Sequence, residues 1–347
     1  MAPTTETMMS GRPPLPFQRR DRDQGARGPD SGTRRTFVAI AGLAALLATS
    51  LARAAVPTAA LGRLIELPIR SSVLASRSVR VWLPDGYDHS AWAYPVLYVP
   101  DAESLFAQAP GPRIGDAGID EHIVGLAFAG EIRTPIVVAI GRSPQHAREY
   151  APAAPLALLP APLRTKAIAS LGGMPLSDAY LHFVTAELKP LVDRTFRALP
   201  GAADTAILGR GAAGNLALYA LMRFPHVFGN AGCLSDRTAM FDPASSAPHA
   251  ALAEVAARYF ETALPRAGSH RLYLDFDNLA GDPAVTQLLR ACTDAARAKG
   301  YVEGLDLVSA LRTVASDNPW RDTDQTDIAL TLLLKSRCPP MRQGRSD

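Results

Sequence analysis

Short apolar segments recur along this chain at the spacing of strands separated by helices. Two of them, residues 95–100 and 134–141, are almost continuously apolar, which is typical of central strands covered on both faces. Further runs of this kind lie at residues 206–208, 228–235, 271–276 and 306–314. An open, mostly parallel sheet between two layers of helices buries such runs most completely, because it hides both faces of each strand.

Helical patterns fill most of the intervals between these runs, at residues 177–196, 213–223, 248–263, 283–299 and 324–334. Residues 63–69 and 78–83 alternate apolar with polar side chains, as a half-buried antiparallel pair does. The alternation predicts the α/β class: a doubly wound, mostly parallel sheet with helices on both faces. Two Pro-rich segments interrupt it. We expect residues 102–118 to line a pocket rim and residues 150–163 to form a cap or lid loop.

One predicted strand, turn and helix start, residues 206–215 (AILGRGAAGN), carries two motifs at once. In α/β-hydrolases this turn is the nucleophile elbow, G-x-S-x-G, with a serine at its tip. Gly211 stands at the tip here, so the turn has no nucleophile. The same letters spell G-x-G-x-x-G, the dinucleotide fingerprint, and Asp236 follows Gly214 by 22 residues. The turn alone leaves both interpretations open.

The first 54 residues have the features of an export signal. A twin-arginine motif at Arg34 and Arg35 precedes an uncharged apolar run, residues 38–52, and an A-x-A pattern that ends at Ala54. The run is shorter than the ~20 residues that a membrane-spanning helix needs. We therefore expect a twin-arginine signal peptide at residues 1–54 and one α/β domain at residues 55–347. The domain is expected to be periplasmic or secreted, with no stable membrane span.

Removal of this leader changes the charge balance. Residues 1–54 hold eight arginines and four acidic residues, which leaves 28 basic and 29 acidic residues and a net charge of −1. This balance predicts no nucleic-acid partner, and we expect no cofactor and no metal. Cys233, Cys292 and Cys338 lack zinc-type spacing. A bridge between Cys292 and Cys338 stays open, whereas Cys233 is predicted to be buried in its strand.

Several blocks in a fixed order resemble the esterase branch of the α/β-hydrolases, which includes esterase D, the enterochelin esterases and the mycolyltransferases. They are residues 81–87 (VWLPDGY), 94–106 (YPVLYVPDAESLF), 135–140 (PIVVAI), 148–152 (REYAP), 187–190 (ELKP), the glycine turn and 224–229 (FPHVFG). The resemblance spans residues 77–334. It implies an α/β-hydrolase fold with a catalytic serine, acid and histidine in that chain order. It also makes the glycine turn an elbow rather than a dinucleotide site.

The three catalytic positions implied by this resemblance carry other residues. Gly211 replaces the serine, Ala280 stands at the acid position, and Asp317 stands where the histidine is expected, three residues before Trp320. In addition, all seven histidines lie at or before His270. A serine nucleophile needs an adjacent base. We therefore predict that no catalytic triad is intact.

Other residues near the turn carry acidic or nucleophilic side chains. Asp277 and Asp282 are alternative acids, and the nearest nucleophile types are Ser235, Cys233 and Ser104. Ser235 without a base is more often a cap or turn residue, and a thiol in an apolar strand is inert.

The elbow also predicts a binding site without a nucleophile. The backbone N–H groups of Ala212, and of Ala102 or Glu103, are expected to face a carbonyl or carboxylate as oxyanion-type donors. The predicted pocket residues are Asp101, Arg210, Ser235 and Trp320.

The sequence thus predicts an exported esterase-family protein that is catalytically inactive and binds an unknown small molecule or protein partner. One alternative is an active carboxylic-ester hydrolase or acyltransferase that uses atypical residues. A second alternative is dinucleotide binding at residues 209–214.

Overall fold

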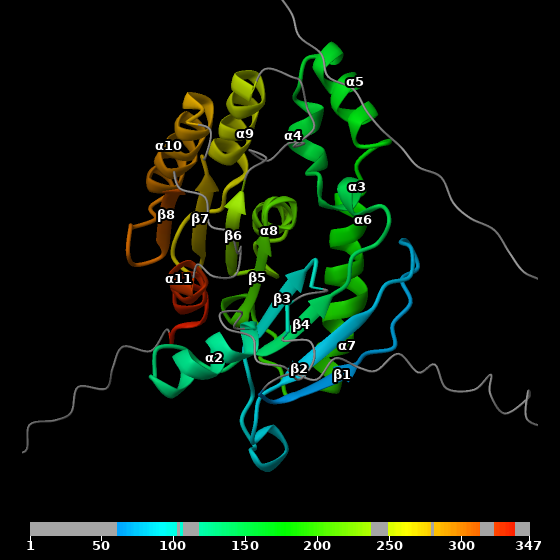
Figure 1. Cartoon of the computed structure of the whole chain (residues 1–347), viewed down its shortest axis with the longest axis vertical. Coiled ribbons are helices and arrows are strands. Elements are labelled where there is room, and N and C mark those ends of the chain that lie inside the picture. The colour runs from blue at the N-terminus through cyan, green and yellow to red at the C-terminus, as the bar shows by residue number, and fades with distance from the viewer. Residues whose placement is uncertain are drawn as a thin grey trace, which may run out of the picture. The chain divides into compact units, whose positions relative to one another are not determined.

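Eight strands form one sheet in the computed structural model, which describes residues 61–102, 105–106, 118–236, 249–278, 281–312 and 323–336 (Figure 1). Their bounds are β1 Arg63–Glu66, β2 Val79–Leu83, β3 Val96–Pro100, β4 Ile136–Ile140, β5 Thr205–Arg210, β6 Asn230–Asp236, β7 Arg271–Asp277 and β8 Leu307–Arg312. Each strand overlaps a segment that the sequence pattern predicts. The described residues all belong to one compact unit, Val56–Asp347.

The strands lie in the order β1-β2-β4-β3-β5-β6-β7-β8. β2 runs antiparallel to both of its neighbours, β1 and β4. All other neighbouring pairs are parallel. The predicted antiparallel pair and the predicted doubly wound, mostly parallel sheet are therefore confirmed.

The described helices are α2 Ile119–Phe128, α3 His146–Tyr150, α4 Ala153–Ala157, α5 Ala161–Ser170, α6 Ser177–His182, α7 Lys189–Thr195, α8 Ala212–Arg223, α9 His249–Ala263, α10 Pro283–Ala298 and α11 Thr323–Leu334. A π-helical segment, η2 Phe183–Leu188, joins α6 to α7, and short 3₁₀ turns lie at η1 Tyr87–His89 and η3 Ala202–Asp204. The helix expected at residues 177–196 is thus one rod with a π segment in its middle. The sequence pattern missed α2, whose interior Gly125 lowers its helix propensity.

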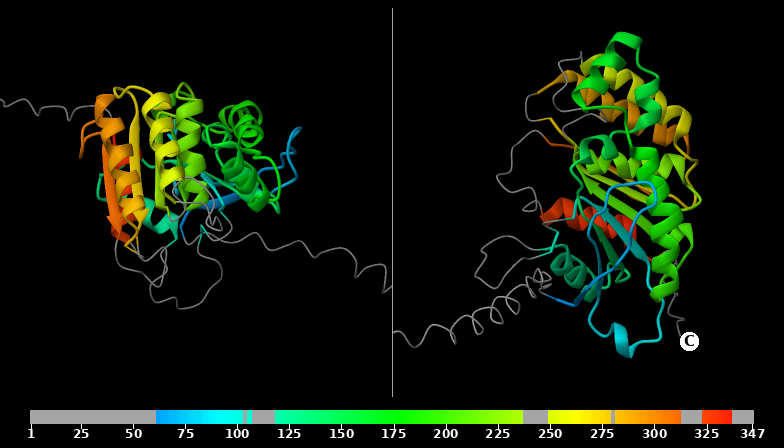
Figure 2. Two further views of the ribbon diagram at one scale, coloured as in Figure 1. Left: turned by 90° about the horizontal axis from the view of Figure 1, so that it is seen from above. Right: turned by 90° about the vertical axis from the view of Figure 1, so that its right-hand side faces the viewer.

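Helices cover both faces of the sheet. In the right-hand view of Figure 2, α2 and α11 lie on one side of the strands, and α8 and α10 lie on the other. The two apolar cores divide the side chains of β3 alternately: Val96 and Tyr98 face one core, and Leu97 and Val99 face the other. Successive strand residues point to opposite faces, so covering both faces requires the continuous apolar runs found in the sequence.

The prediction of a loop at residues 150–163 is wrong, because most of this segment is helical. Tyr150 ends α3, and α4 and the beginning of α5 follow it. Pro152 and Pro160 are the N-cap residues of these two helices, and Pro162 lies in the first turn of α5. Proline is tolerated there because the first N–H groups of a helix have no intrahelical partner. The prolines mark helix starts here.

A buried ion pair ties α3 to the segment before β2. Arg77 donates to both carboxylate oxygens of Glu149, at 2.9 and 2.7 Å, and these side chains are 2% and 0% exposed. The guanidinium also lies 5.2 Å from the ring centre of Tyr180. Burial alone lowers the pKa of Arg77, but the hydrogen bonds to Glu149 and the nearby negative charge outweigh it and raise that pKa. This pair holds α3 in a fixed place beside the end of β4.

Two further expectations concern the cysteines and the membrane. Cys233 and Cys292 are buried, as predicted for Cys233, and Cys338 lies outside the described residues. Within the described ranges, no helix is both long enough and apolar enough to cross a bilayer. The predicted signal peptide, residues 1–54, also lies outside these ranges.

Candidate active site

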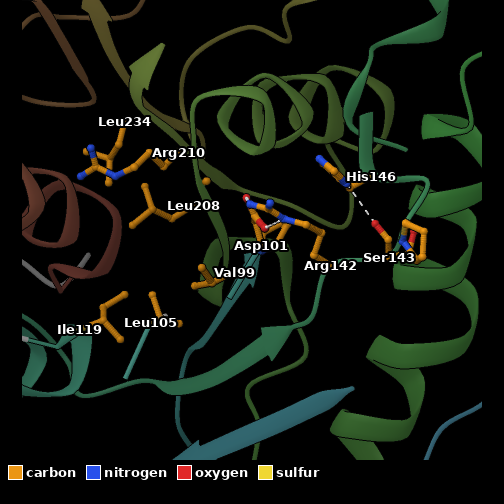
Figure 3. Close-up of a pocket in the computed structure, with 13 residues that line it drawn as sticks. Val99, Asp101, Leu105, Ile119, Arg142, Ser143, His146, Leu208, Arg210 and Leu234 are labelled. Carbon is orange, nitrogen blue, oxygen red and sulfur yellow. Dashed lines mark hydrogen bonds and ion pairs between the residues drawn. The ribbon is translucent and has the colours of Figure 1, made fainter. Parts of the chain in front are cut away.

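A cavity of about 690 Å³ opens at the carboxyl ends of β3, β4, β5 and β6 (Figure 3). Its apolar lining includes Val99, Leu105, Ile119, Leu208 and Leu234, and its polar lining is Asp101, Arg142, Ser143, His146 and Arg210. Figure 3 shows most of the apolar side chains on one side of Asp101, together with Arg210, and shows Ser143 and His146 on the other side. The cavity therefore has an apolar part and a polar part.

The sheet topology explains the position of this cavity. β3 and β5 are neighbours, but the chain leaves β3 toward β4 and leaves β5 toward β6, on the opposite side. Loops that diverge in this way leave a crevice at the carboxyl ends of the strands. Pro100 at the end of β3 and Gly209 near the end of β5 both line the cavity.

Gly211 forms the sharp turn between β5 and α8. Its dihedral angles are φ 54° and ψ −124°, and a positive φ is uncommon in residues other than glycine. Its N–H donates to the carbonyl of Leu234 in β6 at 2.9 Å, and its carbonyl accepts from the N–H of Asn215 in α8 at 3.1 Å. Hydrogen bonds on both sides thus fix the turn next to Arg210, which lines the cavity.

The two flanking glycines are sterically required. A Cβ at Gly209 would lie 2.2 Å from the carbonyl oxygen of Ala213, and a Cβ at Gly214 would lie 2.4 Å from Sγ of Cys233 and 3.0 Å from the carbonyl oxygen of Gly209. These glycines therefore allow α8 to pack closely against β5 and β6. They keep the architecture of an elbow.

Gly211 differs from its neighbours because its side-chain space is open. A Cβ at this position meets no atom within 4 Å. A serine would fit sterically, but a non-glycine residue held in such a conformation costs on the order of 1–3 kcal/mol. Glycine removes both the strain and the nucleophilic oxygen, so the described elbow cannot form a serine acyl-enzyme.

The two alternative acids have other partners. Asp277, at the end of β7, lies with Oδ1 3.5 Å from Nε of Arg312 in β8. Asp282 is the N-cap residue of α10, where its side chain accepts from the N–H of Ala284 at 2.8 Å. Both carboxylates thus contribute to local structure at the β7 and β8 ends. Ala280, at the expected acid position, lies outside the described residues.

His146 is a cavity residue that the sequence analysis missed. It is the one histidine among the described lining residues. Its Nδ1 lies 3.1 Å from the carbonyl oxygen of Ser143 (Figure 3). A carbonyl only accepts hydrogen bonds, so Nδ1 is the donor in this contact, and in the neutral form of the ring Nε2 is then the acceptor. The available signal was its place shortly after β4, at the carboxyl end of a central strand.

Asp101 and Arg142 form a bidentate ion pair within the cavity wall. Nε and Nη2 of Arg142 donate to the two carboxylate oxygens of Asp101, at 2.6 and 2.7 Å. Asp101 has a φ of 63° and is the sole non-glycine residue with positive φ in the described part of the chain. Asp101 was a predicted pocket residue. Arg142 was not, because nothing in its local sequence distinguishes it.

Arg210, a predicted pocket residue, lines the apolar part of the cavity beside Leu234 (Figure 3). Arg210 also acts on a buried tyrosine, Tyr273. Burial is the main cause that raises the pKa of Tyr273, and the nearby carboxylate of Asp275 adds to it, whereas the positive charge of Arg210 opposes the rise.

Ser235 lies inside β6 rather than in a cap or turn. The remaining predicted positions, Glu103, Asp317 and Trp320, lie outside the described residues.

The predicted backbone donors differ in availability. Ala212 is the first residue of α8, and the first N–H groups of a helix have no intrahelical acceptor. The N–H of Ala102 instead donates to the carbonyl of Ile140 at 3.2 Å. Because this bond joins the ends of β3 and β4, Ala102 has a structural role here and is not a second oxyanion donor.

A mostly parallel sheet with a cavity beside the sharp turn after its fifth strand defines an α/β-hydrolase fold. The family model described as "Putative esterase" matches residues 71–271, more than half of the chain. This protein therefore belongs to that esterase family.

The chain is similar to one curated protein and to several solved structures. The uncharacterized protein YbbA of Bacillus subtilis (strain 168) is 25% identical over 161 residues, which are 46% of this chain and 56% of that protein. The enterobactin esterase FES of Shigella flexneri has a TM-score of 0.56 at 17% identity, over 80% of this chain and 60% of that chain. An IroE-like serine hydrolase of Shewanella oneidensis has a TM-score of 0.51 at 19% identity, over 78% and 79%. At these identities the solved structures show a shared fold.

Proposed function

We propose that this protein is an esterase-family member that binds a ligand in the elbow cavity and has lost the serine mechanism. Gly211 carries the proposal. The elbow keeps its backbone geometry, with φ 54° and ψ −124°, and the space for a side chain is open, but no nucleophilic atom stands there. A covalent acyl-enzyme needs such an atom and a partnered base. What remains is a shaped cavity without that chemistry.

The cavity lining supports a ligand that is apolar at one end and carries a carbonyl or carboxylate at the other. Leu105, Ile119 and Leu208 offer an apolar wall. Two residues after the lining residue Arg210, the N-terminus of α8 at Ala212 favours a negative or partly negative oxygen beside the cavity, through its N–H groups and its dipole. The Shigella enterobactin esterase was solved with 2,3-di-hydroxy-N-benzoyl-serine, an aryl amide with a carboxylate. A compound of this build is a suitable first probe.

The decisive experiment compares the natural protein with Gly211→Ser and Gly211→Ala. We expect none of the three to be labelled by a fluorophosphonate or to hydrolyse p-nitrophenyl butyrate above background, because even a serine at position 211 lacks the triad histidine, since no histidine follows His270. Binding of the aryl amide to the natural protein, measured by calorimetry, supports the ligand-binding function. Turnover of the ester by the natural protein at about 1 s⁻¹ or faster, the lower end of typical enzyme rates, contradicts the ligand-binding function.

His146 supports a second candidate function, ester hydrolysis by atypical residues. In this reaction Nε2 of His146 takes a proton from water while the water oxygen attacks the ester carbonyl carbon. The same proton then passes to the leaving alkoxide, and free acid and alcohol result. Turnover that resists fluorophosphonate and disappears in His146→Gln, but persists in the surface variant His89→Gln, would favour this candidate over pure binding.

We also propose that the ligand is met outside the cytoplasm, because the twin-arginine motif, apolar run and A-x-A pattern of residues 1–54 form an export signal. Fractionation of cells that express the full chain tests this. Replacing Arg34 and Arg35 together with lysine should retain the protein in the cytoplasm. A periplasmic location that is unaffected by this change would contradict twin-arginine export.

A further inference from the structure

We infer that Asp101 holds Arg142 in an ion pair until the carboxylate of a ligand takes the place of the Asp101 carboxylate. This inference rests on the proposed ligand-binding function of the cavity. The two N–H donors of Arg142 meet both oxygens of Asp101, at 2.6 and 2.7 Å. This two-point geometry is the one in which an arginine also binds a free carboxylate. Asp101 therefore stands where the anionic end of a ligand would bind.

The exposure of this pair makes it replaceable. The side chains of Arg142 and Asp101 are 50% and 25% exposed, so water can reach both charges when the pair opens and lowers the cost of separating them. The Arg77–Glu149 pair in the same region is 2% and 0% exposed, and opening it would strand a buried charge. Of these two pairs, only the one in the cavity wall can open at low cost.

The backbone directs Asp101 toward Arg142. Asp101 holds a φ of 63°, a conformation that aspartate adopts more readily than most residues but that still costs energy. The next residue, Ala102, is fixed by its hydrogen bond to Ile140. Because the backbone is anchored directly after Asp101, a rotation of the Asp101 side chain separates its carboxylate from Arg142 without movement of the main chain.

The surroundings define the ligand class as an amphipathic carboxylate. Asp101 and Arg142 lie between the apolar side chains of Leu105, Ile119 and Leu208 and the polar pair of Ser143 and His146 (Figure 3). A ligand whose carboxylate binds Arg142 would thus place its apolar part against the leucine and isoleucine side chains. An uncharged analogue would contact the same apolar side chains but would not compete with Asp101 for Arg142.

Calorimetric titration with 4-phenylbutyrate and its uncharged analogue 4-phenylbutyramide tests the inference. The proteins are the natural chain, Asp101→Asn, Asp101→Gly and Arg142→Gln, with Asp88→Asn as the control at an exposed pair elsewhere. We expect both Asp101 variants to bind the carboxylate about threefold to tenfold more tightly, since a tenfold change needs only a small free energy. The amide should bind all five proteins equally, and Arg142→Gln should lose the preference for the carboxylate. Asp101→Gly suits the positive φ and guards against misfolding of Asp101→Asn.

The outcomes separate the inference from the function beneath it. Unchanged or weaker binding of the carboxylate in folded Asp101→Asn and Asp101→Gly, with normal amide binding, overturns the role of Asp101 and leaves the ligand-binding function standing. If Arg142→Gln still prefers the carboxylate over the amide, the role of the Asp101–Arg142 pair is overturned and the ligand-binding function stands. Binding of neither probe to any of the proteins overturns the proposed function and this inference together.

Discussion

Alanine substitutions at three glycines test whether the elbow is kept by sterics or by backbone conformation. At Gly209 a Cβ would lie 2.2 Å from the carbonyl oxygen and 2.3 Å from the carbonyl carbon of Ala213. Both are backbone atoms, so α8 must move away from β5. Overpacking of this kind typically costs about 1–3 kcal/mol and sometimes more. Because no flexible side chain can absorb the clash, we expect Gly209→Ala to lose at least about 3 kcal/mol of unfolding free energy.

At Gly211 the limiting factor is the backbone conformation alone. A Cβ there meets no atom within 4 Å, but φ is 54°. A non-glycine residue held in this conformation costs on the order of 1–3 kcal/mol, so Gly211→Ala should be destabilised by that amount. Gly125 is the matched control, because it lies inside α2, has open space and has no positive φ. Gly125→Ala should stabilise the protein by about 0.5–1 kcal/mol.

Urea unfolding followed by circular dichroism measures the free energy of unfolding of the three variants and of the natural protein. The expected order of stability is Gly125→Ala, natural protein, Gly211→Ala and Gly209→Ala. Two results would refute the reasoning. One is a Gly209→Ala variant that is more stable than Gly211→Ala, and the other is a Gly211→Ala variant as stable as the natural protein. Either would mean that the turn is not held as a tight elbow.

Three further predictions follow from the structure. Glu149→Ala should cost about 3–5 kcal/mol, because it leaves a buried guanidinium unpaired, whereas Arg63→Ala at an exposed pair should cost at most about 1 kcal/mol; equal urea midpoints would contradict this. Burial raises the pKa of five tyrosines, which are Tyr98, Tyr219, Tyr259, Tyr273 and Tyr301. Their raised pKa values contribute stability that is complete below the unfolded pKa of about 10. As the pH rises above this value, the free energy of unfolding should fall by up to about 1.4 kcal/mol per pH unit for each tyrosine, and a flat alkaline stability profile would count against it. Titration with NAD(H) and NADP(H) should show no micromolar binding, and a clear isotherm would revive the dinucleotide interpretation.

Much of the fold could be predicted from the sequence, because burial on both faces leaves a strong signal. Continuous apolar runs located the central strands, and period-2 alternation located the antiparallel pair at β1 and β2. The segments that failed were short ones. The helices α4 and α5 begin at prolines, which favour both loops and first helical turns, and α2 contains a glycine in its interior. Local pattern cannot separate these cases, since tertiary packing decides them.

The candidate site divides in the same way. The sequence by itself determined that Gly211 stands at the tip of the elbow turn and that no histidine follows His270, because motif letters and chain order need no coordinates. Only the tertiary structure decided that Arg142 and His146 share a cavity with Asp101. Asp101 and Arg142 follow the ends of β3 and β4, and His146 begins α3. The register between the two strands, which pairs Val96 with Ile136, 40 residues apart in the chain, brings these segments together. The structure also showed why Gly209 cannot change and Gly211 has room to, since only coordinates reveal what a Cβ would meet.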